Sequence, residues 1–171
     1  MAQKKTLAEM LEGKKLLIFD FDGTIADTSS FHEKAFLETF KHLNLNIEYG
    51  EIAGKKTLDA VHLICKGLNM TNKELKRLAL KKQSIYREVV QLNINPIPGV
   101  DEFLNWLHKS KKFNLAVASS GSKKNVMHCL SKLNYLFFFQ HIVCGDDVKA
   151  GKPNPEIFLK VLDRYNFLKS E

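Results

Sequence analysis

The sequence lacks the features that mark disordered, fibrous and membrane-spanning chains. Only 4 of its 171 residues are proline, and 44% are hydrophobic, which excludes a disordered chain or a fibre. Its apolar runs fall short of the roughly 18 residues that a membrane span needs. Met1 to Gly13 has no apolar stretch behind its lysines and so is not a signal peptide. We therefore expect a globular, cytoplasmic protein with no membrane partner.

Cysteine is scarce as well. The three cysteines, Cys65, Cys129 and Cys144, are odd in number, widely spaced and in no C-x-x-C pair. This excludes a disulfide framework and a zinc site built on cysteine, and it predicts free thiols in a reducing compartment.

Charge of one sign is not concentrated anywhere along the chain. The net charge is +7, from 26 Lys+Arg against 19 Asp+Glu, but the lysines come in short pairs such as Lys55-Lys56 and Lys123-Lys124. Scattered pairs are typical of solvated surface, so we expect no nucleic-acid partner. A basic nucleic-acid binder stays as an alternative, which predicts an affinity that falls steeply with salt.

Three short apolar runs predict the strands of a parallel sheet. They have no polar alternation, which is typical of strands buried on both faces, and they cover residues 16–19, 113–118 and 140–144. Apolar residues at three- and four-residue spacing predict the helices. Ser29 or Ser30, the Thr71–Glu74 capping box and Ser122 are expected to begin three of them. The predicted helices cover residues 29–43, 54–68, 71–90, 100–109, 122–133 and 155–165.

The order of these elements predicts an α/β fold. Strands and helices alternate as in a Rossmann-like, parallel, doubly wound core. Three helices between the first and second strands are too long for a simple crossover and predict an inserted α-helical cap. We therefore expect a discontinuous core of residues 1–28 and 94–171, and a cap of residues 29–93.

An acid pair follows the first strand, in Asp20-Phe21-Asp22-Gly23-Thr24. Ligands bind at the carboxyl ends of parallel strands, and residues two apart in an extended chain share a face. Two neighbouring carboxylates repel, and a cation such as Mg²⁺ relieves that repulsion. Taken alone, the motif fits a strand-to-helix turn with ordinary aspartate caps better than a catalytic site, because short motifs often match by accident.

A hydroxyl and a lysine follow the next two strands. Ser119, with nearby backbone N–H groups, is suited to a phosphoryl oxygen, and Lys152 in Gly151-Lys152-Pro153 is suited to neutralising phosphate or Asp20. Each alone also fits a helix-entry serine or a solvated lysine. Acid pair, hydroxyl and lysine after three successive strands form a far more specific pattern.

In that order the three motifs resemble those of the haloacid dehalogenase (HAD) superfamily of phosphatases and phosphomutases. The helical insertion after Asp27-Thr28 resembles the cap of the group that holds β-phosphoglucomutase, phosphoglycolate phosphatase and small sugar-phosphate phosphatases. The resemblance covers nearly the whole chain and implies a HAD-like core.

The resemblance also implies roles. Asp20 would attack phosphorus and form an aspartyl-phosphate, and Asp22 would protonate the leaving oxygen and then activate water. Mg²⁺ would be bound by the Asp20 carboxylate and the Asp22 backbone carbonyl. The residues implied to bind phosphate are Gly23, Thr24, Ser119 and Lys152.

In the cap, five positions fall where the group often places substrate or hinge residues: Thr28, His32, Gly54, Thr57 and Lys82. His32 either helps to position Asp22 or is an ordinary polar helix residue. β-Phosphoglucomutase has an arginine near Gly54–Thr57 that grips the non-reacting phosphate. Lys55-Lys56-Thr57 stands here instead, which favours a phosphatase over a mutase.

The family's fourth motif, one or two acids after a further strand, completes the Mg²⁺ shell and has no counterpart before Glu171. Asp146 and Asp147 precede Lys152, and Asp163 lies within the last helix. We therefore expect a C-terminally truncated core that binds Mg²⁺ more weakly. Residues 16–19 would then form an exposed sheet edge, open to self-association or to a swapped segment.

These observations lead to one main hypothesis. The chain is expected to be a Mg²⁺-dependent phosphatase that acts on a small phosphorylated metabolite, such as a sugar phosphate or phosphoglycolate. A β-phosphoglucomutase-like phosphomutase and an inactive, truncated binder of phosphate ligands are the alternatives.

Overall fold

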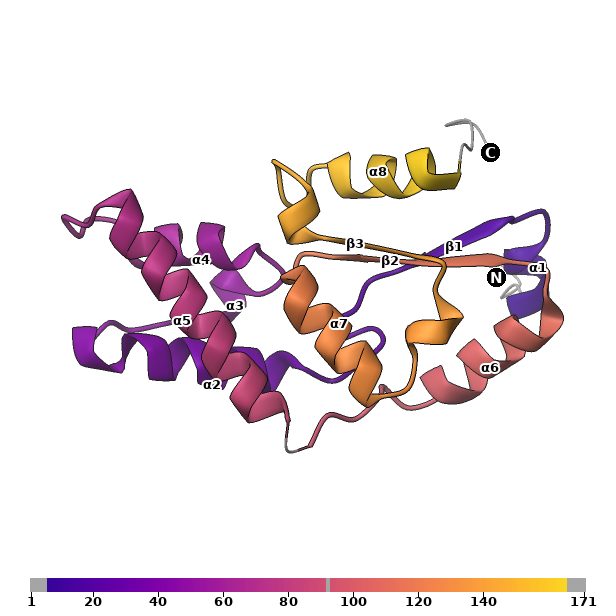
Figure 1. Cartoon of the computed structure of the whole chain (residues 1–171), viewed down its shortest axis with the longest axis horizontal. Coiled ribbons are helices and arrows are strands. Elements are labelled where there is room, and N and C mark those ends of the chain that lie inside the picture. Colours follow the sequence, from indigo (N-terminus) through magenta and orange to yellow (C-terminus); the bar gives the residue numbers. More distant parts are fainter. Residues whose placement is uncertain (1–5, 92, 166–171) are drawn as a thin grey trace, which may run out of the picture.

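The computed structural model describes residues 6–91 and 93–165. A three-stranded sheet of order β1-β2-β3 lies at the centre of the larger part of the molecule (Figure 1). All its strands are parallel, with Leu16 opposite Asn114 and Ala116 opposite His141. This confirms the predicted parallel α/β core. The strands are β1 (Leu16–Phe19), β2 (Asn114–Ser119) and β3 (His141–Cys144).

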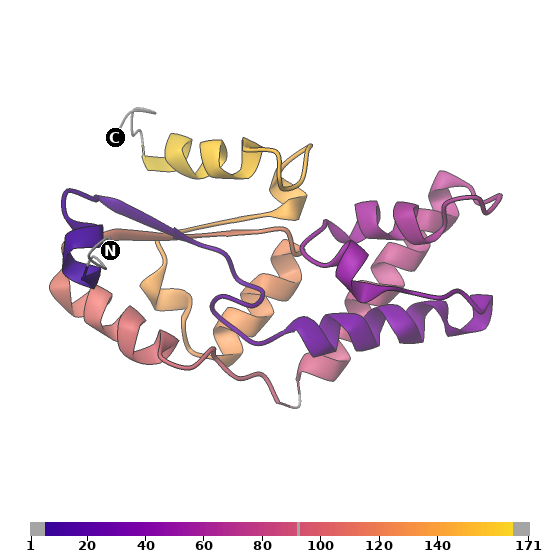
Figure 2. The same cartoon turned by 180° about the vertical axis from the view of Figure 1, so that it is seen from behind.

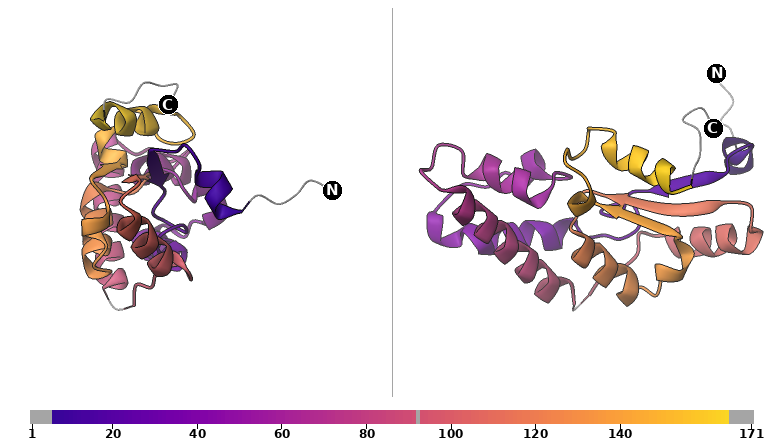
Figure 3. Two further views of the ribbon diagram at one scale, coloured as in Figure 1. Left: turned by 90° about the vertical axis from the view of Figure 1, so that its right-hand side faces the viewer. Right: turned by 45° about the horizontal axis from the view of Figure 1, so that its top comes forward.

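Helices cover both faces of this sheet, because its strands carry apolar side chains on both sides. On one face, Leu16 and Ile18 pack in a cluster with α8 (Glu156–Tyr165). On the other face, Leu17 and Phe19 pack in the main core cluster with α6 (Val100–Ser110) and α7 (Lys123–Lys132). The view from behind and the tilted view show the same layers (Figures 2 and 3).

The helices between β1 and α6 gather at one end of the sheet and form the cap (Figure 1). They enclose an apolar cluster of their own, which includes Phe36 and Val61. At the base of the cap, Ala35 and Tyr86 belong to the cluster of the core instead, so packing is continuous across the hinge. The exact domain boundaries stay a prediction. The cap helices are α2 (Ser29–Phe40), α3 (Tyr49–Ile52), α4 (Thr57–Ile64) and α5 (Asn72–Val90).

Some predicted elements were too long and some short ones were missed. The helix expected over residues 54–68 is α4 alone, because Lys56 before it is extended (φ −58°, ψ 141°). The helix expected over residues 29–43 is α-helical to Phe40 and ends in a 3₁₀ turn, Lys41–Leu43. The short helices α1 (Leu7–Leu11) and α3 were not predicted, since neither is long enough to show a helical period.

Two of the three predicted helix starts were right in position, and one of the two has the capping bond. The Thr71–Glu74 capping box is present, with Thr71 N–H donating to Glu74 Oε2 at 2.7 Å. Neither Ser29 nor Ser30 caps α2: the N-cap position is Thr28, and its hydroxyl bonds Asp22 instead. Ser122 stands at the N-cap of α7, but its hydroxyl makes no capping bond.

The cysteines are free thiols, as predicted, and all three are buried. Among the residues described, none of the helices is both long and apolar enough to cross a membrane.

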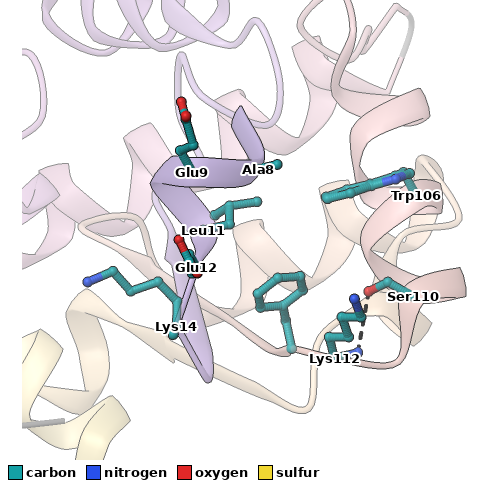
Figure 4. A pocket seen from close by; sticks show the side chains of 10 residues that line it. Ala8, Glu9, Leu11, Glu12, Lys14, Trp106, Ser110 and Lys112 are labelled. Atoms are coloured by element: carbon teal, nitrogen blue, oxygen red, sulfur yellow. Dashed lines mark hydrogen bonds between the residues drawn. The ribbon is translucent and has the colours of Figure 1, made fainter. Parts of the chain in front are cut away.

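The sheet has an open edge at β1, which pairs only with β2 within the described chain. A groove of about 720 Å³ lies at the amino ends of β1 and β2, and Leu11 and Trp106 face it from opposite sides (Figure 4). We call it the edge groove. Its other lining residues are Ala8, Glu9, Glu12, Gly13, Lys14, Ser110, Lys112 and Phe113.

Candidate active site

Asp20 lies directly after β1, where the strand delivers it to the carboxyl edge of the sheet. Its Oδ1 accepts from the Phe21 N–H at 2.8 Å and is 2.9 Å from Lys152 Nζ. The Lys152 ammonium also donates to the carbonyl of Ala118, at the end of β2, at 2.8 Å. The Asp20 side chain is 43% exposed. A fixed but accessible carboxylate beside a cation is the arrangement that a nucleophile toward phosphate needs.

Asp22 lies deeper, and both of its oxygens have donors. Its Oδ1 accepts from Thr28 Oγ1 at 2.7 Å and lies 2.9 Å from His32 Nε2, whereas its Oδ2 accepts from Ser119 Oγ at 3.3 Å. Ser119 is fully buried, and its hydroxyl also accepts from the Gly121 N–H at 3.0 Å. The Asp22 carboxylate, in the loop after β1, is therefore held by side chains from two other segments. These are the start of α2 with the hinge before it, and the end of β2.

A lysine from the cap extends this network. Lys82, on α5, is buried, and its Nζ lies 2.6 Å from His32 Nδ1. An ammonium can donate hydrogen bonds but cannot accept one, so His32 Nδ1 accepts from Lys82. The imidazole proton is therefore on Nε2, which donates to Asp22. Lys82, His32 and Asp22 thus form a continuous relay from cap to core.

Aromatic rings support the relay. The His32 ring stacks on Tyr86 with centroids 4.1 Å apart, and Lys82 Nζ lies 4.4 Å from the centroid of Phe36. A cation over an aromatic face is stabilised by the ring quadrupole. The sequence reading did not single out Phe36 or Tyr86, because their spacing looks like that of ordinary core residues.

Burial and mutual contact shift the pKa values of Asp22, His32 and Lys82. Burial acts to raise the pKa of Asp22, but His32, the hydrogen bonds from His32 and Thr28 and the charge of Lys82 outweigh it and lower that pKa to about 2. Burial lowers the pKa of His32 although Asp22 acts to raise it, in keeping with a neutral imidazole. Burial also lowers the pKa of Lys82 to about 7, against the charge of Asp22. Lys82 can therefore gain or lose a proton near neutral pH.

A cavity of about 40 Å³ between cap and core, which we call the reaction cavity, opens beside these groups. Thr57 lines it, as do Gly54, Lys55 and Ser120. The structure thus brings Thr28, His32, Thr57 and Lys82 together around Asp22. The other lining residues are Phe36, Tyr49, Ile52 and Gly121.

Gly23 and Thr24 form the turn after the acid pair. Gly23 has φ +73°, a conformation that favours glycine, and its N–H donates to the carbonyl of Ala26 at 2.9 Å. The Thr24 N–H donates to the carbonyl of Phe21 at 3.3 Å. These amide hydrogens are used inside the turn, and phosphate contact at the two residues stays a prediction.

Cap and core touch closely at one glycine. The stem of Lys56 crosses Gly151 so tightly that a Cβ there would lie 2.8 Å from Lys56 Cγ. Lys56 Nζ then donates to the carbonyl of Val148 at 2.9 Å. The cap therefore holds the loop that carries Lys152. Sequence reasoning gave Lys56 no role, since only folding brings residues 56 and 151 together.

The donors fit part of a magnesium site. Asp20 offers a partly exposed carboxylate oxygen, and hard oxygen ligands with several waters are what Mg²⁺ prefers. Within residues 6–91 and 93–165, no group of three or more His, Cys, Asp or Glu side chains gathers in a metal-binding arrangement. A magnesium ion would thus be held by few protein side chains of the described chain.

Comparison with known proteins confirms the resemblance to the haloacid dehalogenase superfamily. Residues 17–171 match the haloacid dehalogenase-like hydrolase family. The chain is 31% identical over 156 residues to the phosphorylated carbohydrates phosphatase of Thermotoga maritima (88% of this chain, 70% of the relative). It is 30% identical over 151 residues to the fructose-1-phosphate phosphatase YqaB of Escherichia coli (86% and 78%).

Solved structures point the same way. The β-phosphoglucomutase of Clostridium difficile superposes with a TM-score of 0.82 at 25% identity, over 90% of this chain and 71% of that one. Parallel sheet, helical cap and motif order therefore have one explanation: the chain belongs to the haloacid dehalogenase-like hydrolases.

Proposed function

We propose that this chain is a Mg²⁺-dependent phosphatase for small sugar phosphates that works through an aspartyl-phosphate. One observation carries the proposal: an accessible carboxylate paired with a lysine, Asp20–Lys152, lies beside a second carboxylate, Asp22, that is connected to a proton relay. The names of relatives that act on phosphorylated carbohydrates and fructose 1-phosphate support a sugar phosphate as substrate.

The first half-reaction forms the intermediate. A carboxylate oxygen of Asp20 attacks phosphorus, and the bond from phosphorus to the leaving oxygen breaks with its electron pair on that oxygen. Asp22 delivers a proton to the leaving oxygen, while Lys152 offsets the charge of the transferring group. In the second half-reaction water attacks phosphorus, Asp22 takes a proton from the water, and phosphate leaves Asp20.

The relay supplies the proton that Asp22 needs. Lys82 passes a proton to His32 Nδ1, and His32 passes its Nε2 proton to Asp22. Lys82 and Asp22 then both become neutral, and the imidazole of His32 keeps one proton. The second half-reaction returns the proton by the same route. A lysine whose pKa lies at about 7 can hold or lose a proton at neutral pH. Because the pKa of Asp22 is much lower, the proton passes through Asp22 to the leaving oxygen as that oxygen gains negative charge.

The Asp20 carboxylate and the backbone carbonyl of Asp22 would hold Mg²⁺. When bound, the ion would offset the repulsion between an anionic nucleophile and an anionic phosphate.

Phosphate release tests the proposal. Purified protein is incubated with sugar monophosphates, phosphoglycolate and p-nitrophenyl phosphate, with Mg²⁺ or with EDTA. We expect Mg²⁺-dependent release that Asp20→Asn lowers by at least about 10³-fold, since the nucleophile is lost. Activity that survives this substitution would reject Asp20 as nucleophile.

The same assay separates the alternatives. A phosphomutase yields an isomer that keeps its phosphate, which ³¹P NMR detects, and an inactive binder retains ligand without turnover at any Mg²⁺ concentration.

The open β1 edge carries a second proposal, that two copies of the chain pair there. Its apolar side chains are only partly buried on both faces. Sedimentation velocity should show a dimer that Ile18→Lys weakens, and a monomer at all concentrations would exclude it. Cytoplasmic location stays a prediction.

A further inference from the structure

Side chains of two consecutive residues connect the cap helix α5 to the core helix α7. Arg87 Nη1 donates to Asn125 Oδ1 at 2.8 Å, and the hydroxyl of Tyr86 lies 3.6 Å from Cys129 Sγ. Asn125 and Cys129 are four residues apart and therefore lie on the same face of α7. The two helices also contact each other directly (Figure 1). The C-terminal part of α5 is therefore held in position against α7.

The bond between Arg87 and Asn125 is the stronger of these two connections. A guanidinium is always charged, and a hydrogen bond from a charged donor stabilises more than one between neutral groups. The Asn125 side chain belongs to a residue that is only 4% exposed, so water competes little for its oxygen. A charged donor and a buried acceptor, to which the reaction steps above give no role, thus join cap to core.

The same part of α5 carries the groups that contact His32. Lys82 and Tyr86 are one turn apart, and Lys82 Nζ lies 2.6 Å from His32 Nδ1 while the Tyr86 ring stacks on that imidazole. At the other end of the relay, Asp22 accepts from Ser119, which ends β2, and α7 begins four residues later. The contacts therefore close a ring that runs from α5 through the relay to β2, into α7, and back to α5.

We infer that Arg87 is a positioning residue, whose bond to Asn125 holds α5 where Lys82 reaches His32. A helix rises about 1.5 Å per residue, and hydrogen bonds extend only to about 3.2 Å between heavy atoms. A slip of α5 along α7 by one residue would therefore break the contact between Lys82 and His32. Arg87 itself does not line the reaction cavity. The inference rests on the proposed function and deepens it, because it names a residue that governs proton delivery without touching substrate.

Steady-state kinetics of Arg87→Met, which keeps an apolar stem and removes the donor, test the inference. We expect kcat for alkyl phosphates, whose leaving group needs a proton, to fall by about 10-fold, the size of a lost charged hydrogen bond. The KM for these substrates, and kcat for p-nitrophenyl phosphate, should stay within about 2-fold of wild type, since neither depends on proton delivery. Arg77→Met removes an exposed arginine from the same helix and is the matched control.

The partner residue gives a second arm of the same experiment. Asn125→Ala removes the acceptor and should lower kcat for alkyl phosphates as much as Arg87→Met does. The double variant should be no slower than either single variant, because the two residues act as one pair. Asn125→Asp keeps an oxygen acceptor for Arg87 and should retain most of the activity.

Trace labelling with acetic anhydride reports on the lysine without any need for catalysis. The reagent acetylates neutral amines, and mass spectrometry compares Lys82, which is buried, with Lys76, which is exposed on the same helix. In Arg87→Met the labelling of Lys82 relative to Lys76 should rise by at least about 5-fold, because a loosened α5 exposes the amine. In Arg77→Met it should not change.

Three results would overturn the inference. One is unchanged labelling of Lys82 in Arg87→Met, and another is an equal loss of kcat on alkyl phosphates and p-nitrophenyl phosphate. The third is an effect of Arg87→Met that Asn125→Ala does not share, which would assign it to the charge of Arg87. If the wild type hydrolyses none of the phosphates, the proposed function fails on its own, and the labelling still decides whether Arg87 positions Lys82.

Discussion

The reaction cavity and the edge groove contrast in both size and chemistry. The edge groove is far larger, about 720 Å³ against about 40 Å³, and Leu11, Trp106 and Phe113 supply much of its wall. The reaction cavity lies between cap and core, and several of its polar side chains are joined by short hydrogen bonds. The two lie at opposite ends of the parallel strands. In this fold the direction of the strands therefore indicates where the candidate active site lies, and the volume of a cavity does not.

The sharpest test of this contrast is at Lys82. In Lys82→Met, which keeps the apolar stem, we expect kcat for alkyl phosphates to fall by about 10²-fold, since the relay loses its proton donor. The loss should be smaller for p-nitrophenyl phosphate, whose leaving group needs little protonation. Lys82→Arg keeps the charge but cannot release a proton, so it should resemble the methionine variant.

The pH profile of the wild type sharpens the same point. The pKa of Lys82 is lowered to about 7, so the lysine is protonated below that pH and loses its proton above it. The kcat/KM for alkyl phosphates should therefore decline above about pH 7 in the wild type. Both Lys82 variants should lack this limb, and an unchanged limb in either would rule out Lys82 as the proton donor.

A smaller effect is expected at Thr28. Thr28→Val conserves shape but removes the hydroxyl that donates to Asp22 at 2.7 Å. Because bonds to a carboxylate are stronger than neutral ones, kcat should fall by about 10-fold. Thr28→Ser restores a hydroxyl and should recover most of the activity. Failure of that rescue would point to packing in place of hydrogen bonding.

The smallest effect is expected in the edge groove. Trp106 is 47% exposed and stacks on Phe103 with centroids 6.1 Å apart. Trp106→Ala should lower the free energy of unfolding by about 1 kcal/mol and leave kcat/KM within about 2-fold of wild type. Denaturant unfolding followed by circular dichroism, with steady-state kinetics, measures both. A loss comparable to that of Lys82→Met would break the contrast between the two regions.

Much of the fold could be predicted from the sequence, because buried parallel strands leave a plain signal. The run Leu16–Phe19 is apolar throughout and forms β1, as predicted. The strand after residue 112 was placed one residue early, since Phe113 is as apolar as the strand itself. The short helices and the N-cap position of α2 at Thr28 could not be predicted from the sequence, because tertiary contacts determine them.

The places of four candidate site residues were predictable, but the connections of their side chains were not. Asp20, Asp22 and Lys152 come after strands and Ser119 ends one, and the carboxyl ends of parallel strands meet at one edge of the sheet. Fifty residues separate Lys82 from His32, and nothing in their local spacing shows that the two side chains bond. The same holds for Ser122, which stands at the predicted start of α7 but whose buried hydroxyl makes no capping bond.

The crossing of Lys56 over Gly151 sets how near the two halves of the molecule can come. Because Gly151 has no side chain, the Lys56 stem can pass directly over it. Any larger residue would push the two segments apart. A side chain there would push Lys56 away from Gly151, hold the cap apart from the core and admit water between them. The distance between cap and core therefore depends on a residue that does not line the reaction cavity.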